Sequence, residues 1–201
     1  MFGSAFLINA FPSPGDFFLN FRTVTEKLLV SFNEQNIRYA LIGGYAVGLW
    51  GVARGTVDMD FLVLRDNLDD IDRIMDSLGY ELRYRSENVS QYIAQRSIFG
   101  EIDFLHAFRA PSLRMLERAA DKAVFGEGLP IKVLIPEDLI GLKIQAIANN
   151  ENRAPVDLQD IELLVQLHGD KMDWQLIEEY CEIFDMMDLY EKLKGKYNAV
   201  Q

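Results

Sequence analysis

The hydrophobic pattern of the chain changes from helical spacing to strand-like runs and back to helical spacing. Apolar residues at helical intervals predict an amphipathic helix over residues 16–36. Short apolar or alternating runs, bounded by glycine and polar residues, predict strands separated by shorter helices. We expect strands at 37–42, 58–64, 80–85, 91–98 and 102–106, and helices at 45–51, 67–79 and 113–122.

The pattern becomes helical throughout near residue 136. Segments 123–125 and 131–135 flank a glycine-rich turn and predict a hairpin. Pro136, followed by two acidic residues, predicts a helix start, because proline and acids both favour the first turn. Later helices are expected at 156–168, 174–184 and 187–194. The sequence therefore predicts an α+β fold: an N-terminal arm, a helix and a mixed β-sheet core in residues 1–135, with a helical subdomain in 136–201 packed on it.

The charge balance is acidic. The 201 residues carry a net charge of −11, which argues against a broad electrostatic grip on nucleic acid. The cations in the middle of the chain form either a local basic patch or ordinary solvated positions. They are Arg83, Arg85, Arg96, Arg109, Arg114, Arg118 and Lys122.

Three further features limit the cofactor and the location. The one cysteine, Cys181, excludes a disulfide within the chain and is expected to be a buried helix thiol. His106 and His168 lack the spacing of a zinc site, so both are expected to be structural. Residues 1–10 are apolar, but they have no basic region and are too short to span a bilayer. We therefore expect a cytoplasmic protein without a membrane partner.

The most informative chemical pattern joins a glycine pair to two alternating acids. Gly43 and Gly44 lie between a predicted strand and a short helix, so their backbone can approach a phosphate closely. Asp58 and Asp60 are two residues apart on the next strand, which places both carboxylates on one face. Mg²⁺ is usually held by carboxylates together with substrate phosphates. The pattern favours a metal and phosphate site; its alternative is a solvated strand of alternating polarity.

A third acid lies on a later predicted strand. Placed beside the strand of Asp58 and Asp60, Asp103 would complete a cluster of three carboxylates. Such a cluster is strongly repulsive unless cations neutralise it, so it indicates a two-metal site. Glu101 is the alternative third acid, or it simply marks the start of the strand.

Charged residues also mark the predicted helical part. Lys143 borders the buried stripe of its helix, where it is either a snorkelling surface lysine or a cation that reaches a β- or γ-phosphate. Arg153, Asp157 and Asp160 open the following helix. Capping of that helix is the simplest interpretation of the two aspartates.

The glycine and aspartate motifs resemble the DNA polymerase β-like nucleotidyltransferase superfamily. Its signature is an apolar residue, Gly-Gly or Gly-Ser, a spacer and Asp-apolar-Asp. The chain is similar in residues 41–44, followed by thirteen residues and then residues 58–61. Arg54 and Thr56 extend the similarity toward the AbiEii-type branch, which includes toxins of bacterial toxin–antitoxin and phage-abortive systems.

Two later segments resemble the same branch. The helix that contains Lys143 and the Arg153-x-x-x-Asp157-x-x-Asp160 helix start occur in the order found there. The resemblance therefore covers about residues 37 to 167. It implies a nucleotidyltransferase that moves NMP from an NTP to a hydroxyl of a tRNA, a protein or a small molecule.

The resemblance also implies a set of site residues and partners. It implies two Mg²⁺ ions, or Mn²⁺ in their place, and an antitoxin protein as partner of a toxin. Some members of the family lack the third acid; if Asp103 is misplaced, NTP binding is still expected and the chemistry is put in doubt. The implied catalytic and metal-binding residues are Asp58, Asp60 and Asp103, and the implied nucleotide-binding residues are Gly43, Gly44, Arg54, Thr56, Lys143 and Asp157.

Two other function classes compete with this interpretation. The first is a non-catalytic protein on a degenerate transferase fold, which binds a nucleotide or a partner. The intact Asp58, Asp60 and Asp103 argue against it. The second is a two-metal nuclease, which is weaker because the glycine pair and Lys143 suit a triphosphate better than a phosphodiester.

Overall fold

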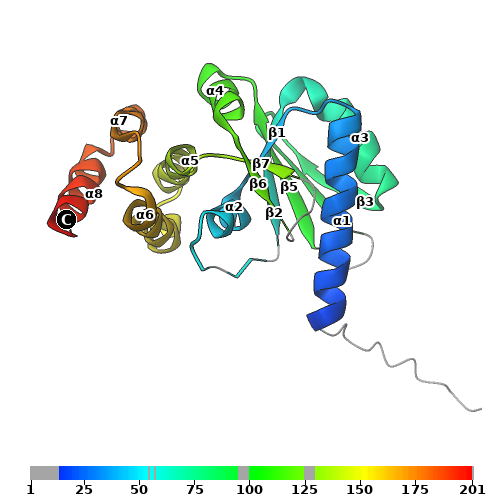
Figure 1. Ribbon diagram of the computed structural model, residues 1–201. Coiled ribbons are helices and arrows are strands. Elements are labelled where there is room, and N and C mark those ends of the chain that lie inside the picture. Colours follow the sequence, from blue (N-terminus) through cyan, green and yellow to red (C-terminus); the bar gives the residue numbers. More distant parts are fainter. Residues whose placement is uncertain (1–13, 54, 57, 95–99, 125–129, 201) are drawn as a thin grey trace, which may run out of the picture.

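A seven-stranded mixed sheet lies at the centre of the molecule, with helices on both sides (Figure 1). The computed structural model describes residues 14–53, 55–56, 58–94, 100–124 and 130–200. The strands are β1 (Tyr39–Ile42), β2 (Met59–Leu64), β3 (Tyr80–Arg85), β4 (Val89–Ala94), β5 (Glu101–Ala107), β6 (Ala120–Ala123) and β7 (Pro130–Val133). Their order in the sheet is β3-β4-β5-β2-β1-β7-β6. The pairs β2–β5 and β1–β7 are parallel, and the other neighbours are antiparallel.

The helices confirm the predicted α+β class, because from Pro136 onward the described elements are all helical. No helix in the described ranges is both long and apolar enough to cross a membrane. The α-helices are α1 (Pro14–Glu34), α2 (Gly43–Leu49), α3 (Leu68–Ser77), α4 (Ala110–Arg118), α5 (Pro136–Asn149), α6 (Ala154–His168), α7 (Trp174–Ile183) and α8 (Met187–Val200). Short 3₁₀ turns, η1 (Arg65–Asn67) and η3 (Glu151–Arg153), precede α3 and α6.

Several predicted boundaries need correction, and three of them bear on the candidate site or on the sheet. The helix expected from residue 45 begins at Gly43, so both glycines belong to α2. Asp58 was expected inside a strand but precedes β2, which begins at Met59. Residues 120–122, expected at the end of a helix, belong to β6, because pairing with β7 overrides their helical propensity. The predicted hairpin is thereby confirmed with a shifted first strand. The N-terminal arm lies outside the described residues.

The face of the sheet toward α1 carries a buried aromatic core. Phe61 of β2 and Phe104 of β5 stack with ring centroids 5.7 Å apart. Phe32 of α1 meets Phe61 edge-on at 5.7 Å, and all three side chains are fully buried. In Figure 1, α5 to α8 lie on the other side of the sheet. Side chains that alternate with these rings, including Asp60 and Asp103, therefore point toward the helical side.

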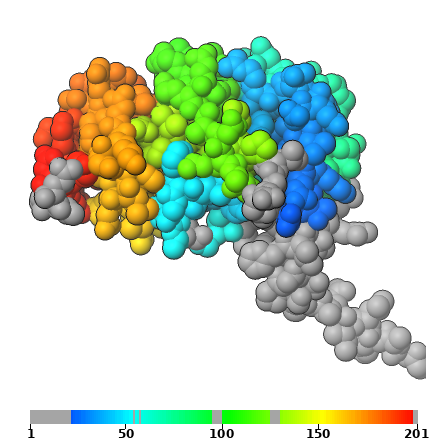
Figure 2. All heavy atoms as spheres, in the orientation of Figure 1, coloured from blue at the N-terminus to red at the C-terminus, as the bar shows by residue number. Residues whose placement is uncertain are grey.

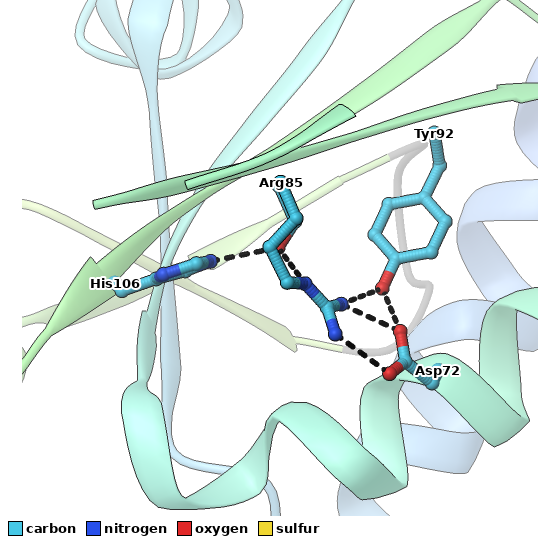
Figure 3. Close-up of polar contacts among 5 residues, drawn as sticks. Asp72, Arg85, Tyr92 and His106 are labelled. Atoms are coloured by element: carbon cyan, nitrogen blue, oxygen red, sulfur yellow. Dashed lines mark hydrogen bonds and ion pairs between the residues drawn. The ribbon is translucent and has the colours of Figure 1, made fainter. Parts of the chain in front are cut away.

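A polar network joins α3 to the sheet (Figure 3). Arg85 donates to both carboxylate oxygens of Asp72, at 2.9 and 2.6 Å, and to the Ser90 hydroxyl at 2.9 Å. His106 Nδ1 lies 2.9 Å from the Glu87 carbonyl oxygen, to which it must donate, so Nε2 accepts the Ser90 proton at 2.8 Å. Ser90 is fully buried, so this pair is a structural tie and not an accessible nucleophile.

This network predicts a pH-dependent stability. Burial, with help from the charges of Arg85 and Arg65, holds the pKa of His106 below its usual value of 6.5. As the pH falls, the unfolded chain therefore takes up a proton before the folded protein does. We expect the free energy of unfolding to fall below pH 6.5 until the lowered pKa is passed. His106→Asn, which keeps a donor for Glu87, should weaken this dependence.

Urea titrations of the wild type and of His106→Asn at about pH 7.5 and about pH 5.5 measure the effect. The difference between the two proteins removes the contributions of all other groups. Equal changes in the two proteins would contradict the prediction.

Candidate functional site

Two of the predicted acids lie side by side near the start of their strands. Asp60 of β2 and Asp103 of β5 are register partners on parallel neighbours, so their side chains share one face of the sheet. Ile42, the last residue of β1, pairs with Asp60 on its other flank. The chain then turns into α2 at Gly43, directly beside the carboxylates. The topology thus assembles the glycine turn and two acids from three strands.

Burial and neighbouring negative charges destabilise the charged form of both carboxylates. Burial and the charges of Asp103 and Asp58 raise the pKa of Asp60 to about 6. Burial also raises the pKa of Asp103, and the charges of Glu101 and Asp58 raise it further. The hydrogen bond from Gln91 partly offsets this rise. The charge of Asp58 therefore acts on both of the other acids. Carboxylates with pKa values raised in this way are typical of functional sites.

Gly43 makes room for Asp60. Its φ of +68° is a conformation that side chains rarely adopt, and a Cβ there would stand 2.0 Å from Asp60 Oδ2. The turn was predicted to let backbone approach a phosphate; in this structure it lets backbone approach a carboxylate. The glycine is required by the site itself and not by the helix that it begins.

Gly43→Ala is expected to damage both stability and activity. The left-handed conformation costs an alanine roughly 1–2 kcal/mol, and its methyl group must displace the Asp60 carboxylate. Displacement of a reacting group by about 1 Å lowers turnover by about a hundredfold. Gly48→Ala, in the same helix with nothing within 4 Å of the added Cβ, is the matched control. Thermal unfolding and an activity assay of both variants measure the effect, and two variants that behave alike would refute it.

Gln91 is a site residue that the sequence did not reveal. It is the register partner of Asp103 on β4, and its Nε2 donates to Asp103 Oδ2 at 3.2 Å. Asp103 Oδ1 is buried and has no hydrogen-bond partner among the described residues. Gln91 therefore fixes the carboxylate so that one oxygen remains for another ligand. A glutamine on an amphipathic strand carries no sequence signal of this role, because the role depends on pairing with β5.

The other predicted residues that precede β2 have fewer contacts with the paired carboxylates in the described structure. Asp58 is exposed, one residue before the strand. The Thr56 hydroxyl donates to the Asp58 carbonyl oxygen at 3.4 Å, so it contacts the backbone that carries this acid. Gly44 is the second residue of α2. Arg54 lies outside the described residues.

Lys143 forms the centre of a buried ion cluster. Its Nζ lies 2.8 Å from Asp157 Oδ1 and 2.6 Å from Asp160 Oδ2, and the Lys143 side chain is only 10% exposed. Arg153 donates to the second oxygen of Asp157 at 2.9 Å. Burial alone would raise the pKa of Asp157, but the bonds from Lys143 and Arg153 hold it below its usual value. The aspartates therefore do more than cap α6.

The ion cluster faces the paired carboxylates. The charges of Arg153 and Lys143 act on Asp60 and partly offset the rise of its pKa. The Lys143 ammonium donates to two carboxylates, so the predicted phosphate contact would compete with these partners. That contact remains a prediction.

The acids can supply part of the coordination of a metal ion and would leave the rest to other ligands. Within the described part of the chain, no three His, Cys, Asp or Glu side chains form a group placed to hold a metal. The three predicted carboxylates are therefore not preassembled as a closed cage. Asp60 nevertheless has a raised pKa, and Asp103 has a buried carboxylate oxygen without a partner among the described residues. Mg²⁺ commonly takes one or two carboxylates and completes its coordination with phosphates and water.

The fold is that of a nucleotidyltransferase. ANT(2″)-Ia, in a crystal structure with adenylyl-2″-tobramycin, is 16% identical with a TM-score of 0.59, over 87% of this chain and 97% of that chain. A nucleotidyltransferase-like protein from Paracoccidioides brasiliensis is 19% identical with a TM-score of 0.52, over 85% of this chain and 91% of that one. Both are similar in fold at low identity, so they define the architecture and not the substrate.

Residues 19–189 match the model of a family described as uncharacterised nucleotidyltransferase, and the chain belongs to that family. No curated protein matches the sequence. The nucleotidyltransferase class that the motifs indicated is thereby confirmed.

Proposed function

We propose that the protein transfers NMP from an NTP to a hydroxyl group of an acceptor. One observation carries the proposal: Asp60 and Asp103 are register partners beside the Gly43 turn, and an oxygen of Asp103 is buried without a partner. Family membership supports the reaction class. The complex of ANT(2″)-Ia with adenylyl-2″-tobramycin, a nucleotidylated hydroxyl compound, supports it further.

Asp103 is the proposed general base. The acceptor oxygen attacks the α-phosphorus in line, a new P–O bond forms, the bond to the β-phosphate oxygen breaks and pyrophosphate leaves. The hydroxyl proton passes to Asp103, whose raised pKa makes it a better base than an ordinary aspartate. Gln91 orients this carboxylate through its bond to Oδ2.

Asp58, Asp60 and Asp103 are the proposed holders of two Mg²⁺ ions, or of Mn²⁺ in their place. When bound, such ions neutralise the triphosphate and acidify the acceptor hydroxyl. The carboxylates must be ionised to bind them, so the raised pKa of Asp60 predicts that metal affinity rises with pH through about 6.

The remaining residues are proposed to hold the nucleotide. The backbone of Gly43 and Gly44 faces the triphosphate, with Arg54 and Thr56 beside it. Lys143 contacts phosphate in competition with its carboxylate partners, and Asp157 supports Lys143.

The finer assignment within the superfamily is also a proposal. The order of the lysine helix and the Arg153-x-x-x-Asp157 start supports the AbiEii-type branch, with a cytoplasmic toxin role and an antitoxin partner. The acceptor is then a tRNA, a protein or a small molecule.

Incubation with each α-labelled NTP, Mg²⁺ and cell extract tests the reaction. We expect label in one acceptor fraction and release of pyrophosphate, both abolished by Asp58→Asn in a protein that stays folded. Metal-dependent NTP binding without pyrophosphate release would instead identify a non-catalytic binder. Undiminished transfer by Asp58→Asn would overturn the assignment of this acid.

A further inference from the structure

A cleft of about 780 Å³ lies between the sheet and the helical side of the molecule. Its floor is formed by Leu62 of β2, Leu105 of β5 and Val89 of β4, and its walls by α4, α5 and α7. In Figure 2, the surface is notched between α4 (green) and α7 (orange). The volume is that of sites for drug-sized molecules, which range from about 300 to 1,000 Å³.

The cleft adjoins the paired carboxylates along the strands. Leu62 follows Asp60 by two residues, and Leu105 follows Asp103 by two, so each pair shares the face of its strand. Leu62 and Leu105 are themselves register partners, as Asp60 and Asp103 are. Two residues along a strand are roughly 7 Å, so the floor begins one step from the proposed reaction centre.

The same relation holds on the third strand of the floor. Val89 pairs with Leu105, and Gln91 pairs with Asp103. The catalytic row and the floor of the cleft are therefore two successive rows of one sheet face. A molecule in the cleft has its near end beside Asp103, the proposed base.

The lining of the cleft is apolar with a few neutral polar groups. Met115, Leu142 and Phe184 provide apolar walls, and Gln145 and Asn149 of α5 provide amides. No aspartate or glutamate belongs to the lining among the described residues.

Charge in the cleft is as sparse on the basic side. Among the described lining residues, Arg109 is the one lysine or arginine. Its guanidinium lies 5.0 Å from the Phe108 ring centroid. Burial lowers the pKa of His106, which favours its uncharged form. The cleft is therefore close to uncharged.

We infer that this cleft binds the acceptor, and that the acceptor is a drug-sized hydroxyl compound with an apolar face and little or no net charge. The inference rests on the proposed transferase function and names the substrate class of that site. A polycation would bury ammonium groups without carboxylate partners, which is strongly unfavourable. A nucleic acid strand would need several cations along its phosphates, and Arg109 alone does not supply them.

Saturation-transfer NMR of three probes tests the binding step without relying on catalysis. The probes are n-octyl β-D-glucoside below its micelle concentration, neomycin, and a 12-residue oligoadenylate RNA. Ala146→Trp fills the cleft from α5, and Ala148→Trp places the same ring on the exposed side of the same helix. We expect the glucoside to bind the wild type and Ala148→Trp, with at least a tenfold loss of affinity in Ala146→Trp.

The outcomes separate this inference from the proposed function. A glucoside signal that Ala146→Trp does not change, or no glucoside binding at all, would overturn the inference. Neomycin or RNA binding that depends on Ala146 would overturn it as well. The transferase proposal is judged separately by pyrophosphate release from NTP and Mg²⁺ in cell extract. Ala146→Trp should still bind NTP and Mg²⁺ as the wild type does, because the nucleotide site lies one row away.

Discussion

Asparagine in place of Asp60 is expected to lower NMP transfer by about a hundred- to a thousandfold while making the protein more stable. The loss of activity follows because the substitution removes a charge from the centre of the site, between Asp103 on one side and the Gly43 turn on the other. The gain in stability follows because this charge is repelled by its surroundings in the folded protein. Opposite signs for activity and stability distinguish a functional acid from a structural one.

The size of the stability gain follows from the pKa of Asp60, which is raised from 3.8 to about 6. A raised carboxyl pKa means that the ionised form destabilises the fold, so the gain in Asp60→Asn is at most about 3 kcal/mol. It should be complete above pH of about 6 and disappear as the pH falls toward 3.8. Urea unfolding at several pH values and transfer of labelled NMP measure the two effects. Asp66→Asn, at an exposed position in η1, is the control and should change neither. A less stable Asp60→Asn would contradict the electrostatic argument.

Methionine in place of Lys143 is expected to lower the free energy of unfolding by about 3–5 kcal/mol. The Lys143 ammonium lies 2.8 and 2.6 Å from Asp157 and Asp160, whose side chains are 2% and 7% exposed. Methionine matches the lysine stem in size, so the variant removes the charge and leaves the packing nearly intact. The two buried carboxylates then lose the cation that holds them charged.

The ion cluster also supplies its own test. Lys143→Met combined with Asp160→Asn should recover part of the lost stability, because one of the stranded charges is removed. Lys196→Met breaks an exposed pair with Glu162 at 2.6 Å and should cost less than about 1 kcal/mol. Equal losses in the Lys143 and Lys196 variants would show that the buried cluster contributes no more than a surface pair.

Much of the fold was predictable because its signals are local. The helix from Pro136 to Asn149 and the strand from Tyr80 to Arg85 match their predicted limits. In both, apolar spacing and nearby proline or glycine act within a few residues. The first strand of the predicted hairpin was expected at 123–125 and lies at 120–123, because β6 exists only through its pairing with β7. A short charged segment carries no local sign of that pairing.

The site was predictable in its residues and not in its contacts. The sequence marked Asp60, Asp103 and Gly43, and the structure places them together. It did not reveal Gln91, whose amide reaches Asp103 from a neighbouring strand. It also suggested a phosphate contact for Lys143, where the structure shows a buried ion cluster. A sequence motif shows which side chains are present, but it does not show which residues on neighbouring strands they contact.

The sequence by itself determined the class of fold, the glycine turn and the acids of the candidate site, since these depend on residue type and on spacing along one or two elements. Only the tertiary structure decided that Asp60 and Asp103 are neighbours, that Gly43 yields its space to a carboxylate, and that a nearly uncharged cleft adjoins them. The reason is physical: burial and charge repulsion depend on distances across the sheet. Those distances are set by the order of the strands, in which β5 lies beside β2.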